Sequence, residues 1–463
     1  MTKRSYFFCG VGGSGMLPLA MYLRETGHTV QGSDRAIDQG RADEVRARLE
    51  AAGIEIFPQD GSGLSSKDQV LVTSSAVEAT IPDVAAAQAL GADHMIRAQL
   101  LSQLTNEAEV SCGIAGTSGK STTTAMLAHI LTTCARDPAV VNGAPILNFE
   151  DTEGRPMGWR GGGGAFVCEV DESDGSIARY NPSVGVILNV SEDHKPMAEL
   201  KELFGGFAER SGRAVLGIDS EPVAAIAESL PRDKVVSCSL TGEADFSVSV
   251  LETVSEGFDV DVRTPSGEVK LRLPMIGSFN VGNALAAMAA ASELGVAPGD
   301  AAAALGSFKG SARRLQTMGS ARGVTVIDDF AHNPEKIEGS IGALRKHYER
   351  LFLFYQPHGY GPLASFRGLY EDAFAASLGP DDELFVSEPA FFGGTVTKTD
   401  DAQVLVRNVA ARGANTRFAE SRDVFLQEIS RAQAGDAVII MGARDDSLTT
   451  FAKKALTTLE KAS

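Results

Sequence analysis

The stretch Gly113–Thr124 reads Gly-Ile-Ala-Gly-Thr-Ser-Gly-Lys-Ser-Thr-Thr-Thr and decides the fold of the central part of the chain. An apolar run enters a glycine-rich turn, Lys120 follows, and a helix-forming stretch runs from Ala125 to Leu131. In such a strand–turn–helix, backbone N–H groups surround a triphosphate, the lysine reaches the β- and γ-phosphates, and a hydroxyl binds Mg²⁺. The sequence therefore predicts a phosphate-binding loop, although Ile114 stands where the common pattern has glycine. The alternative is an ordinary strand–turn–helix that contains Gly-Lys-Ser by chance.

Composition restricts the class of protein. The chain has 463 residues, a length that suggests about three domains. Its 43% hydrophobic and 22% charged residues are typical of a soluble globular protein, and no apolar run approaches the roughly 20 residues that span a membrane. The net charge of −18 argues against a nucleic-acid partner, which needs a basic face. Five scattered cysteines without metal-ligand spacing, and an N-terminus unlike a signal peptide, predict a cytoplasmic protein.

Strand-like and helix-like segments alternate along most of the chain. This alternation predicts an α/β fold with parallel sheets. We expect a Rossmann-like domain at 1–106, a P-loop ATPase-like domain at 107–315 and a second Rossmann-like domain at 316–463. The central domain should have a parallel sheet and a small antiparallel insert at 246–273, where polar and apolar residues alternate.

A second glycine-rich turn lies near the N-terminus. Gly10-Val-Gly-Gly-Ser-Gly15 follows a short apolar run, and Gly32-Ser-Asp34 follows about 20 residues later, as in a dinucleotide-binding fingerprint. The pattern fits any pyrophosphate-bearing ligand, including a UDP-sugar. It also fits an NAD-dependent oxidoreductase, but that alternative gives Lys120 no role.

Acidic side chains follow two apolar strands of the central block. The run Glu169-Val-Asp-Glu-Ser-Asp-Gly175 ends one strand, and Asn189-Val-Ser-Glu-Asp-His194 ends another. Acids at strand ends beside a nucleotide loop are placed to bind Mg²⁺ directly or through water. The alternative is a solvated acidic loop.

Further polar groups lie at ends of elements. Asn280 and Asn283 lie at the start of an alanine-rich helix expected at 279–294. They can cap this helix, or they can contact a base or ribose. Arg313-Arg314 can clamp a phosphate or remain a solvated pair. His332 and His358 follow two strands of the third block, and ligands of parallel sheets bind outside such strand ends.

Taken together in chain order, these motifs resemble the Mur ligases, the ATP-dependent amino-acid ligases of peptidoglycan precursor synthesis. They cover nearly the whole chain. The matching pieces are Gly10-Val-Gly-Gly-Ser-Gly-Met16, Gly32-Ser-Asp34, Thr73-Ser-Ser-Ala76, Arg97-Ala98, Gly116-Thr-Ser-Gly-Lys-Ser-Thr122, Glu169-Val-Asp-Glu-Ser-Asp-Gly-Ser176, Asp193-His194, Asn280, Asn283-Ala284, Arg313-Arg314, Asp328-Asp-Phe-Ala-His332 and Gln356-Pro-His358.

The resemblance implies a function for each block. The first domain would bind the UDP-sugar, the second ATP, and the third the incoming amino acid. With ATP and Mg²⁺, the enzyme would join the lactyl carboxylate of UDP-N-acetylmuramate to an amino acid, L-alanine being favoured, through an acyl phosphate. It would act as a monomer or homodimer, without a nucleic acid or a membrane.

The resemblance also implies roles for individual residues. The catalytic groups would be Lys120, Glu169 and His194, and the metal would be held or oriented by Ser121, Glu169 and His194. ATP would be contacted by Gly116, Thr117, Ser118, Gly119, Lys120, Ser121, Thr122, Asn280, Asn283, Arg314, Asp328 and His332. The UDP-sugar would be contacted by Gly12, Gly13, Ser14, Gly15, Ser33, Asp34, Ser74, Ser75 and Arg97. The amino-acid site would include His358, Tyr360, Arg367 and Arg444.

Several positions depart from the pattern of the similar ligases that add L-alanine. Phe279 and Asn333 stand where those enzymes usually have histidine, and the segment 359–367 lacks two arginines of a usual Arg-Tyr-x-Arg loop. An arginine there can hold a carboxylate bidentately. Arg367 or Arg444 is a candidate substitute. The alternatives are therefore a ligase for another amino acid, a recycling ligase that adds a peptide, or a non-catalytic nucleotide-binding regulator.

Overall fold

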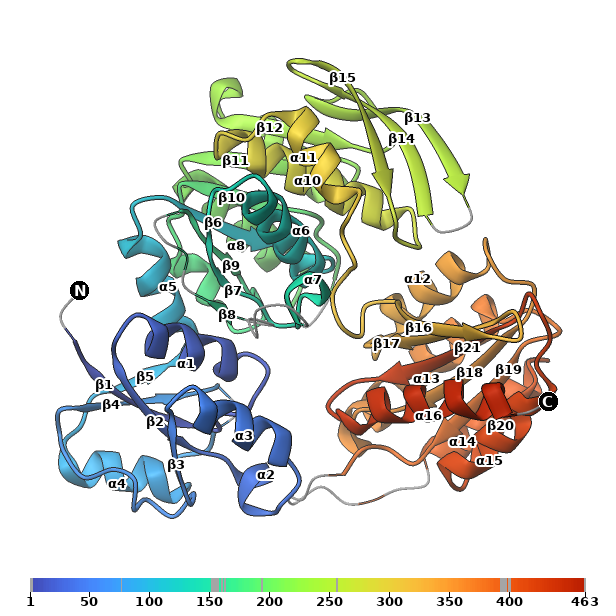
Figure 1. The fold of residues 1–463 in the computed structure, drawn as a ribbon, viewed down its shortest axis with the longest axis horizontal. Coiled ribbons are helices and arrows are strands. Elements are labelled where there is room, and N and C mark those ends of the chain that lie inside the picture. The colour runs from blue at the N-terminus through green and yellow to red at the C-terminus, as the bar shows by residue number, and fades with distance from the viewer. Residues whose placement is uncertain are drawn as a thin grey trace. The chain divides into compact units, whose positions relative to one another are not determined.

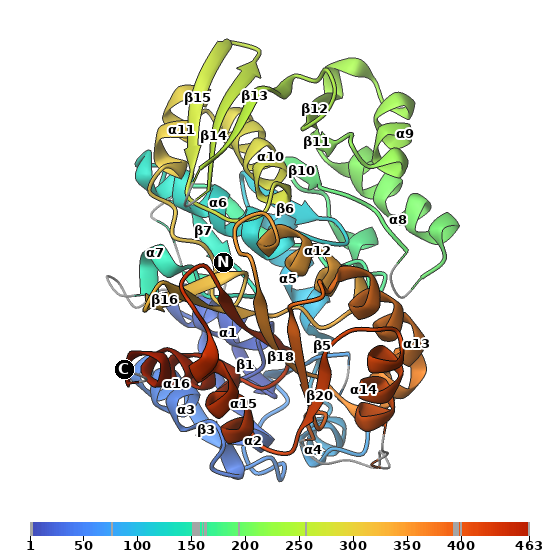
Figure 2. The ribbon, with the colours of Figure 1, turned by 90° about the vertical axis from the view of Figure 1, so that its right-hand side faces the viewer.

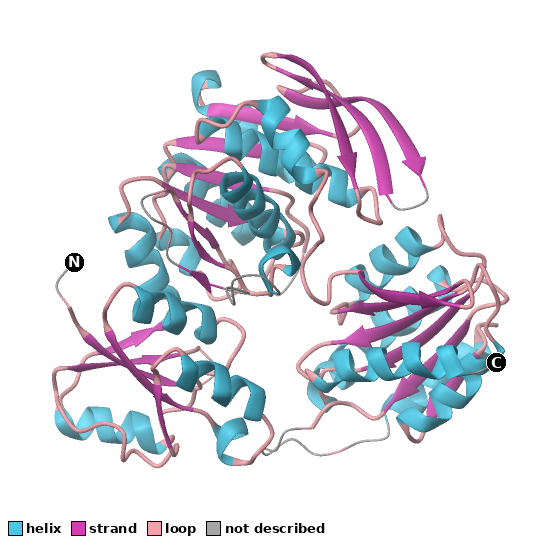
Figure 3. Ribbon diagram, in the orientation of Figure 1, coloured by secondary structure: helices cyan, strands magenta, loops and turns pink. Residues whose placement is uncertain are grey.

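The computed structural model describes residues 3–75, 77–150, 158–159, 161, 164–192, 195–254, 257–391, 398 and 401–461. Within these residues the strands form three sheets, each flanked by helices (Figures 1 and 3). Two compact units result: Met1–Met275 with Phe279–Gly310, and Ile276–Ser278 with Ser311–Ser463. The first unit contains two of the sheets. Among the described helices, none combines the length and apolar character needed to cross a membrane.

The first sheet is entirely parallel and has the strand order β3-β2-β1-β4-β5. Such an order places the ends of β1 and β4 at the point where the winding direction reverses, which is where ligands bind in open α/β sheets. The strands are β1 (Ser5–Cys9), β2 (Thr29–Ser33), β3 (Glu55–Phe57), β4 (Gln69–Thr73) and β5 (His94–Ile96). The helices are α1 (Met16–Glu25), α2 (Arg35–Asp38), α3 (Asp43–Ala51), α4 (Pro82–Leu90) and α5 (Arg97–Glu107).

The second sheet continues from a parallel centre into an antiparallel edge. Its order is β15-β14-β13-β12-β11-β10-β6-β9-β7-β8, and the pairs β13–β14, β14–β15 and β7–β8 are antiparallel. The strands are β6 (Ser111–Ala115), β7 (Ala139–Val141), β8 (Gly158–Trp159), β9 (Phe166–Glu169), β10 (Val184–Ile187), β11 (Arg213–Gly217), β12 (Val235–Ser239), β13 (Phe246–Val254), β14 (Gly257–Thr264) and β15 (Gly267–Leu273). The predicted insert is thus β13–β15.

Helices cover both faces of this second sheet because successive strand residues point to opposite sides. Ile114 of β6 packs into one apolar cluster with α6 (Lys120–Thr133), α10 (Phe279–Glu293) and α11 (Pro298–Leu305). Ala115 packs into another with α8 (Met197–Arg210) and α9 (Glu221–Ser229). This second cluster continues into the first sheet's domain, where the Tyr22 and Phe166 ring centroids lie 5.2 Å apart. The remaining short helices of this part are α7 (Leu147–Glu150), η1 (Ser176–Arg179) and η2 (Arg232–Lys234).

The third sheet has the order β16-β17-β21-β18-β19-β20 and is parallel except for β16–β17. Helices α12, α13 and α14 pack on one face and α15 and α16 on the other (Figure 2). The strands are β16 (Gln316–Ala321), β17 (Val324–Asp329), β18 (Leu351–Gln356), β19 (Glu383–Ser387), β20 (Thr416–Ala419) and β21 (Ala437–Gly442). The helices are α12 (Pro334–Leu344), α13 (Tyr360–Ser377), α14 (Asp401–Ala411), α15 (Arg422–Glu428), η3 (Ile429–Arg431) and α16 (Ser447–Lys461).

The predicted fold class is confirmed: each of the three sheets is parallel-rich and covered by helices. The expected helix at 279–294 is α10, and the expected glycine turn before 120 joins β6 to α6. The exact division into domains stays a prediction.

Candidate active site

The predicted phosphate loop joins the buried strand β6 to α6. Gly116 and Gly119 have φ values of +140° and +91°, a region that favours glycine. A Cβ at Gly119 would lie 2.5 Å from the Asn283 side-chain oxygen, so a larger residue does not fit. Asn189, just after β10, fixes the loop, because its Oδ1 accepts from the Ser118 N–H at 2.9 Å and its carbonyl accepts from the Thr117 N–H.

The Lys120 ammonium lies within this loop. Its Nζ donates to the Gly116 carbonyl at 2.6 Å and to Glu172 Oε2 at 2.9 Å. The two charged side chains are 18% and 8% exposed. Lys120 therefore already holds one anion, at the place where the sequence predicts that it meets phosphate.

Glu169 and Ser121, both predicted metal ligands, meet beside the loop. The Ser121 hydroxyl donates to Glu169 Oε2 at 3.0 Å, and Glu169 Oε1 accepts from the Gly143 N–H. Carboxylate and hydroxyl oxygens are ligands that Mg²⁺ prefers, so this donor pair fits such an ion. His194 lies outside the described residues. Within them, no three His, Cys, Asp or Glu side chains gather as a metal site.

Asp171 adds negative charge next to Lys120. Burial by itself raises the pKa of this carboxyl, but the Lys120 charge and hydrogen bonds from Ser173 outweigh burial, and the pKa lies below its ordinary value. The acidic run after β9 is therefore folded around the loop lysine, rather than being a wholly solvated acidic loop.

A cavity of about 320 Å³ adjoins the phosphate loop within the first unit. Asn280 and Asn283 are buried, and the Asn283 amide donates to Asn280 Oδ1 at 3.0 Å. Phe279 is 45% exposed at the start of α10. The cavity is lined by Ser118, Gly119, Leu188, Asn189, Gly217, Asp219, Ser220, Cys238, Ser239, Leu240, Phe279, Gly282, Asn283, Leu285 and Ala286.

Asp219 shapes the wall of this cavity and was not among the predicted site residues. Its carboxylate accepts from the Ser239 hydroxyl at 2.6 Å, the Leu240 N–H at 2.6 Å and the Thr241 hydroxyl at 2.8 Å. These bonds outweigh burial and hold the pKa of Asp219 below its ordinary value. Asp219 and Leu240 follow parallel strands, and that strand-end position was the signal that could have identified them.

The N-terminal glycine turn is closed by Asp34. The Asp34 carboxylate accepts from the Gly12 N–H at 3.0 Å and from the Ala36 N–H at 2.8 Å, so it fixes the turn and caps α2. A Cβ at Gly15 would lie 3.1 Å from the Arg97 side chain. The structure therefore brings together the predicted residues Gly12, Gly13, Ser14, Gly15, Asp34 and Arg97.

The other predicted UDP-sugar residues are three serines, of which one is buried and two follow strand β4. Ser33 is buried, and its hydroxyl donates to the buried Asp83. Ser74 and Ser75 directly follow β4, whose Thr73 pairs with Cys9 of β1 in the parallel register. Ser74 and Ser75 therefore lie at the same sheet edge as the glycine turn.

In the second unit, Asp328 is fully buried. Its Oδ1 lies 3.3 Å from Arg313 Nε, and its Oδ2 accepts from the Thr449 hydroxyl at 2.6 Å. The Arg314 guanidinium lies 4.9 Å from the centre of the Phe330 ring. The nucleotide-binding roles of Arg314, Asp328 and His332 stay predictions.

His332 and His358 meet at the carboxyl edge of the third sheet. Their ring centroids are 5.1 Å apart, and His332 Nδ1 lies 2.9 Å from the Phe330 carbonyl. Burial, together with the nearby Lys336 charge, lowers the pKa of His332 to about 3. The imidazole of His332 is therefore neutral at physiological pH.

The predicted amino-acid site residues are in different environments. The Tyr360 hydroxyl donates to Glu388 Oε2 at 3.1 Å. Arg367 forms an ion pair with Asp401, which ties α13 to α14, and a second one with Glu371 of its own helix. Arg444 is exposed just after β21.

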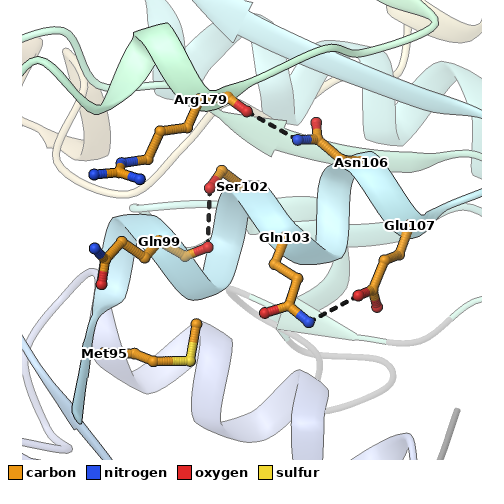
Figure 4. Close-up of a pocket in the computed structure, with 7 residues that line it drawn as sticks. All are labelled: Met95, Gln99, Ser102, Gln103, Asn106, Glu107 and Arg179. Carbon is orange, nitrogen blue, oxygen red and sulfur yellow. Dashed lines mark hydrogen bonds between the residues drawn. The ribbon is translucent and has the colours of Figure 1, made fainter.

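A second cavity, of about 580 Å³, is lined mainly by residues of α5 (Figure 4). No predicted site residue lines it. Gln103 donates to Glu107 at 2.7 Å, and the Asn106 amide donates to the Arg179 carbonyl at 2.8 Å (Figure 4). Its lining consists of Met95, Gln99, Ser102, Gln103, Asn106, Glu107 and Arg179.

Comparisons with known proteins agree along the chain. Residues 5–109 match the model "Mur ligase family, catalytic domain", residues 114–291 match "Mur ligase middle domain", and residues 313–444 match "Mur ligase, glutamate ligase domain". A UDP-N-acetylmuramate–L-alanine ligase of Synechococcus sp. (strain JA-2-3B'a(2-13)) is 34% identical over 451 residues, which cover 95% of this chain and 90% of the relative.

Two solved structures share the fold. The UDP-N-acetylmuramate–alanine ligase of Thermotoga maritima superposes with a TM-score of 0.80 at 22% identity, covering 99% of this chain and 100% of that one. A murein peptide ligase of Psychrobacter arcticus 273-4 gives a TM-score of 0.73 at 24% identity, covering 99% of both chains. With three matched domains and a relative above 30% identity over nearly the full length, the chain belongs to the Mur ligase family.

Proposed function

We propose that the protein is an ATP-dependent ligase that joins the lactyl carboxylate of UDP-N-acetylmuramate to the amino group of L-alanine in peptidoglycan precursor synthesis. One observation carries the proposal: Lys120, Ser121 and Glu169 converge at the glycine loop between β6 and α6. The name of the Synechococcus relative supports the same reaction.

The proposed reaction has two steps. A lactyl carboxylate oxygen attacks the γ-phosphorus, the bond to the β-phosphate oxygen breaks, and ADP leaves with an acyl phosphate remaining. The amine nitrogen then attacks the acyl carbon, inorganic phosphate leaves, and the ammonium proton passes to solvent or a basic group. The protein's contribution is positioning and charge neutralisation, as in other phosphoryl transfers.

Lys120 is the proposed partner of the transferred phosphoryl group. Its ammonium lies within the loop, so it can neutralise charge that develops on the γ-phosphate oxygens. Ser121 and Glu169, with His194 as a further candidate, would hold a Mg²⁺ ion that neutralises the β- and γ-phosphates.

The cavity beside the loop is the proposed adenosine site. It begins at Ser118 and Gly119 of the phosphate loop and extends to the exposed ring of Phe279. An aromatic face and apolar side chains such as Leu240 suit a purine, while Asn283 offers polar atoms. Gly116, Thr117 and Thr122 complete the proposed contacts to phosphate.

The first sheet would bind the UDP-sugar at its reversal point. The glycine turn held by Asp34 supplies backbone N–H groups, and Arg97 supplies a positive charge for the pyrophosphate. We propose that the segment 1–106 binds the UDP-sugar and that the segment 107–315 binds ATP. The segment 316–463 would bind the amine donor near His358 and Tyr360.

We further propose that the enzyme works in the cytoplasm as a monomer or homodimer, without a nucleic acid or a membrane. All five cysteines are free thiols, and the net charge of −18 disfavours a polyanionic partner.

The test is ADP release coupled to mass analysis of the product. UDP-N-acetylmuramate, ATP and MgCl₂ are supplied with L-alanine, other amino acids or short peptides, and the expected product is the L-alanyl amide. Turnover only with another amino acid or with a peptide would identify a paralogue or a recycling ligase instead. If no amine supports ADP release, the ligase function is wrong, and NADH binding by fluorescence then tests the oxidoreductase alternative.

A further inference from the structure

We propose that Arg444 binds the carboxylate of the amine donor and thereby restricts donors to amino acids, in which a free carboxylate lies beside the reacting amine. The inference rests on the proposed function. It concerns how the carboxylate of the amine donor is held.

Arg444 lies at the carboxyl edge of the third sheet. It follows β21, which is hydrogen-bonded to β17 on one side and β18 on the other. The segment after β17 carries His332 and the segment after β18 carries His358, whose rings meet. Arg444 therefore leaves the sheet between the strand that leads to His332 and the strand that leads to the proposed donor site near His358.

The turn that carries Arg444 is fixed on both sides. Before it, the Gly442 carbonyl accepts from the Arg313 guanidinium at 2.6 Å. After it, Asp445 accepts from the Gln356 amide at 2.9 Å and from Arg422 at 2.8 Å. A guanidinium on such a rigid turn loses little conformational freedom of the backbone when it binds a ligand.

The backbone of Arg444 is itself unusual. Its φ is +64°, in the left-handed region that glycine adopts without strain. A side chain held in this region is strained, and such strain clusters at functional sites. Arg322 has strain of the same kind, so the strain supports the proposal only together with the position of Arg444 at the carboxyl edge of the sheet.

Three other arginines of the second unit each form an ion pair with an aspartate. Arg313 is paired with Asp328, Arg422 with Asp445, and Arg367 with Asp401. In the described part of the second unit, the guanidinium groups with neither a hydrogen bond nor an ion pair are those of Arg322, Arg407 and Arg444.

Of these three, only Arg444 follows a parallel strand of the sheet. Arg322 lies in the turn before β17, at the opposite edge, and Arg407 lies within α14. An unoccupied guanidinium offers a planar pair of N–H donors that matches a carboxylate. Arg367, the other candidate named from the sequence, is paired with Asp401, whereas the Arg444 guanidinium has no such partner among the described residues.

The test compares Arg444→Gly with the matched control Arg322→Gly. Both residues are exposed arginines with left-handed φ, +64° and +55°, so glycine relieves backbone strain equally in both. We expect Arg444→Gly to raise KM for L-alanine roughly 10- to 100-fold while the KM values for ATP and UDP-N-acetylmuramate stay unchanged. Arg444→Lys should recover part of the loss, and Arg322→Gly should match the parent enzyme.

L-Alaninamide, which has no carboxylate, provides the second measurement. The parent enzyme should use it far less well than L-alanine, and Arg444→Gly should remove most of this preference. The inference is overturned if both glycine variants have the parent KM for L-alanine, or if the loss appears in the KM for ATP. An inactive parent enzyme would instead reject the proposed function, so the two failures are distinguishable.

Discussion

The Lys120 ammonium and the Glu172 carboxylate lie 2.9 Å apart, although 52 residues separate them in the chain. Both side chains are largely buried, so each charge depends on the other for compensation. A nucleotide phosphate that enters the loop must compete with Glu172 for the same ammonium. If the loop binds ATP as proposed, we therefore expect this contact to couple nucleotide affinity to the stability of the unliganded enzyme.

Glu172→Gln tests that coupling. We expect ATP to bind more tightly, because a neutral amide competes less with phosphate, and the unliganded protein to lose about 1–3 kcal/mol of unfolding free energy. Calorimetric titration and thermal unfolding with and without ATP measure both effects. Glu293→Gln, which removes the carboxylate of the more exposed pair with Arg213, is the control. Weaker or unchanged ATP binding would contradict the competition.

Glu169→Gln should raise the MgCl₂ concentration needed for half-maximal ADP release at least about tenfold. The reason is that Glu169 and Ser121 form the oxygen pair proposed to hold the ion, and loss of a carboxylate weakens such a site. Asp174→Asn, which changes an exposed acid in the same run, should leave the MgCl₂ titration unchanged. An unaltered titration for Glu169→Gln would remove this residue from the metal site.

Phe279→Ala should raise KM for ATP roughly 2- to 13-fold, corresponding to about 0.5–1.5 kcal/mol of lost aromatic contact. The KM for UDP-N-acetylmuramate should not change, because the Phe279 ring lines the cavity next to the phosphate loop. Val250→Ala is the matched control, since Val250 is also 45% exposed but lies on β13 outside the cavity. Equal ATP kinetics for the two variants would place adenosine elsewhere.

Because His129 is buried, we expect the folded protein to lose stability in mild acid. His129 is 5% exposed, its Nε2 lies 2.9 Å from the Ala304 carbonyl, and burial lowers its pKa below 6.5. The unfolded chain therefore binds a proton more readily than the folded protein. The stabilisation from the neutral His129 imidazole is complete above pH 6.5, the ordinary pKa of histidine. It is lost as the pH falls below that value, by at most about 1.4 kcal/mol per pH unit.

His129→Gln keeps a donor for Ala304 but cannot titrate in this range. Its urea midpoint should fall less than that of the parent protein between about pH 7.5 and about pH 5.5. Identical slopes for parent and His129→Gln would show that another group dominates the acid response.

Local patterns in the sequence were sufficient for the fold class and the family. Apolar runs that alternate with helical segments encode strand–turn–helix units, and Gly116, Gly119 and Lys120 act within one such unit. The antiparallel insert and the helix at 279–294 were predicted for the same reason, because residue spacing reports periodicity directly.

Only the tertiary structure decided which distant side chains meet. The pairing of Lys120 with Glu172, the wall built by Asp219, and the occupation of Arg367 by Asp401 all depend on strand order and helix packing. Strand order and helix packing cannot be predicted from residue spacing. The sequence around an arginine is the same whether or not a distant carboxylate pairs with it in the folded protein. The sequence by itself therefore determined a phosphate-binding α/β ligase, whereas the structure decided that Arg444, and not Arg367, has an unoccupied guanidinium at the sheet edge.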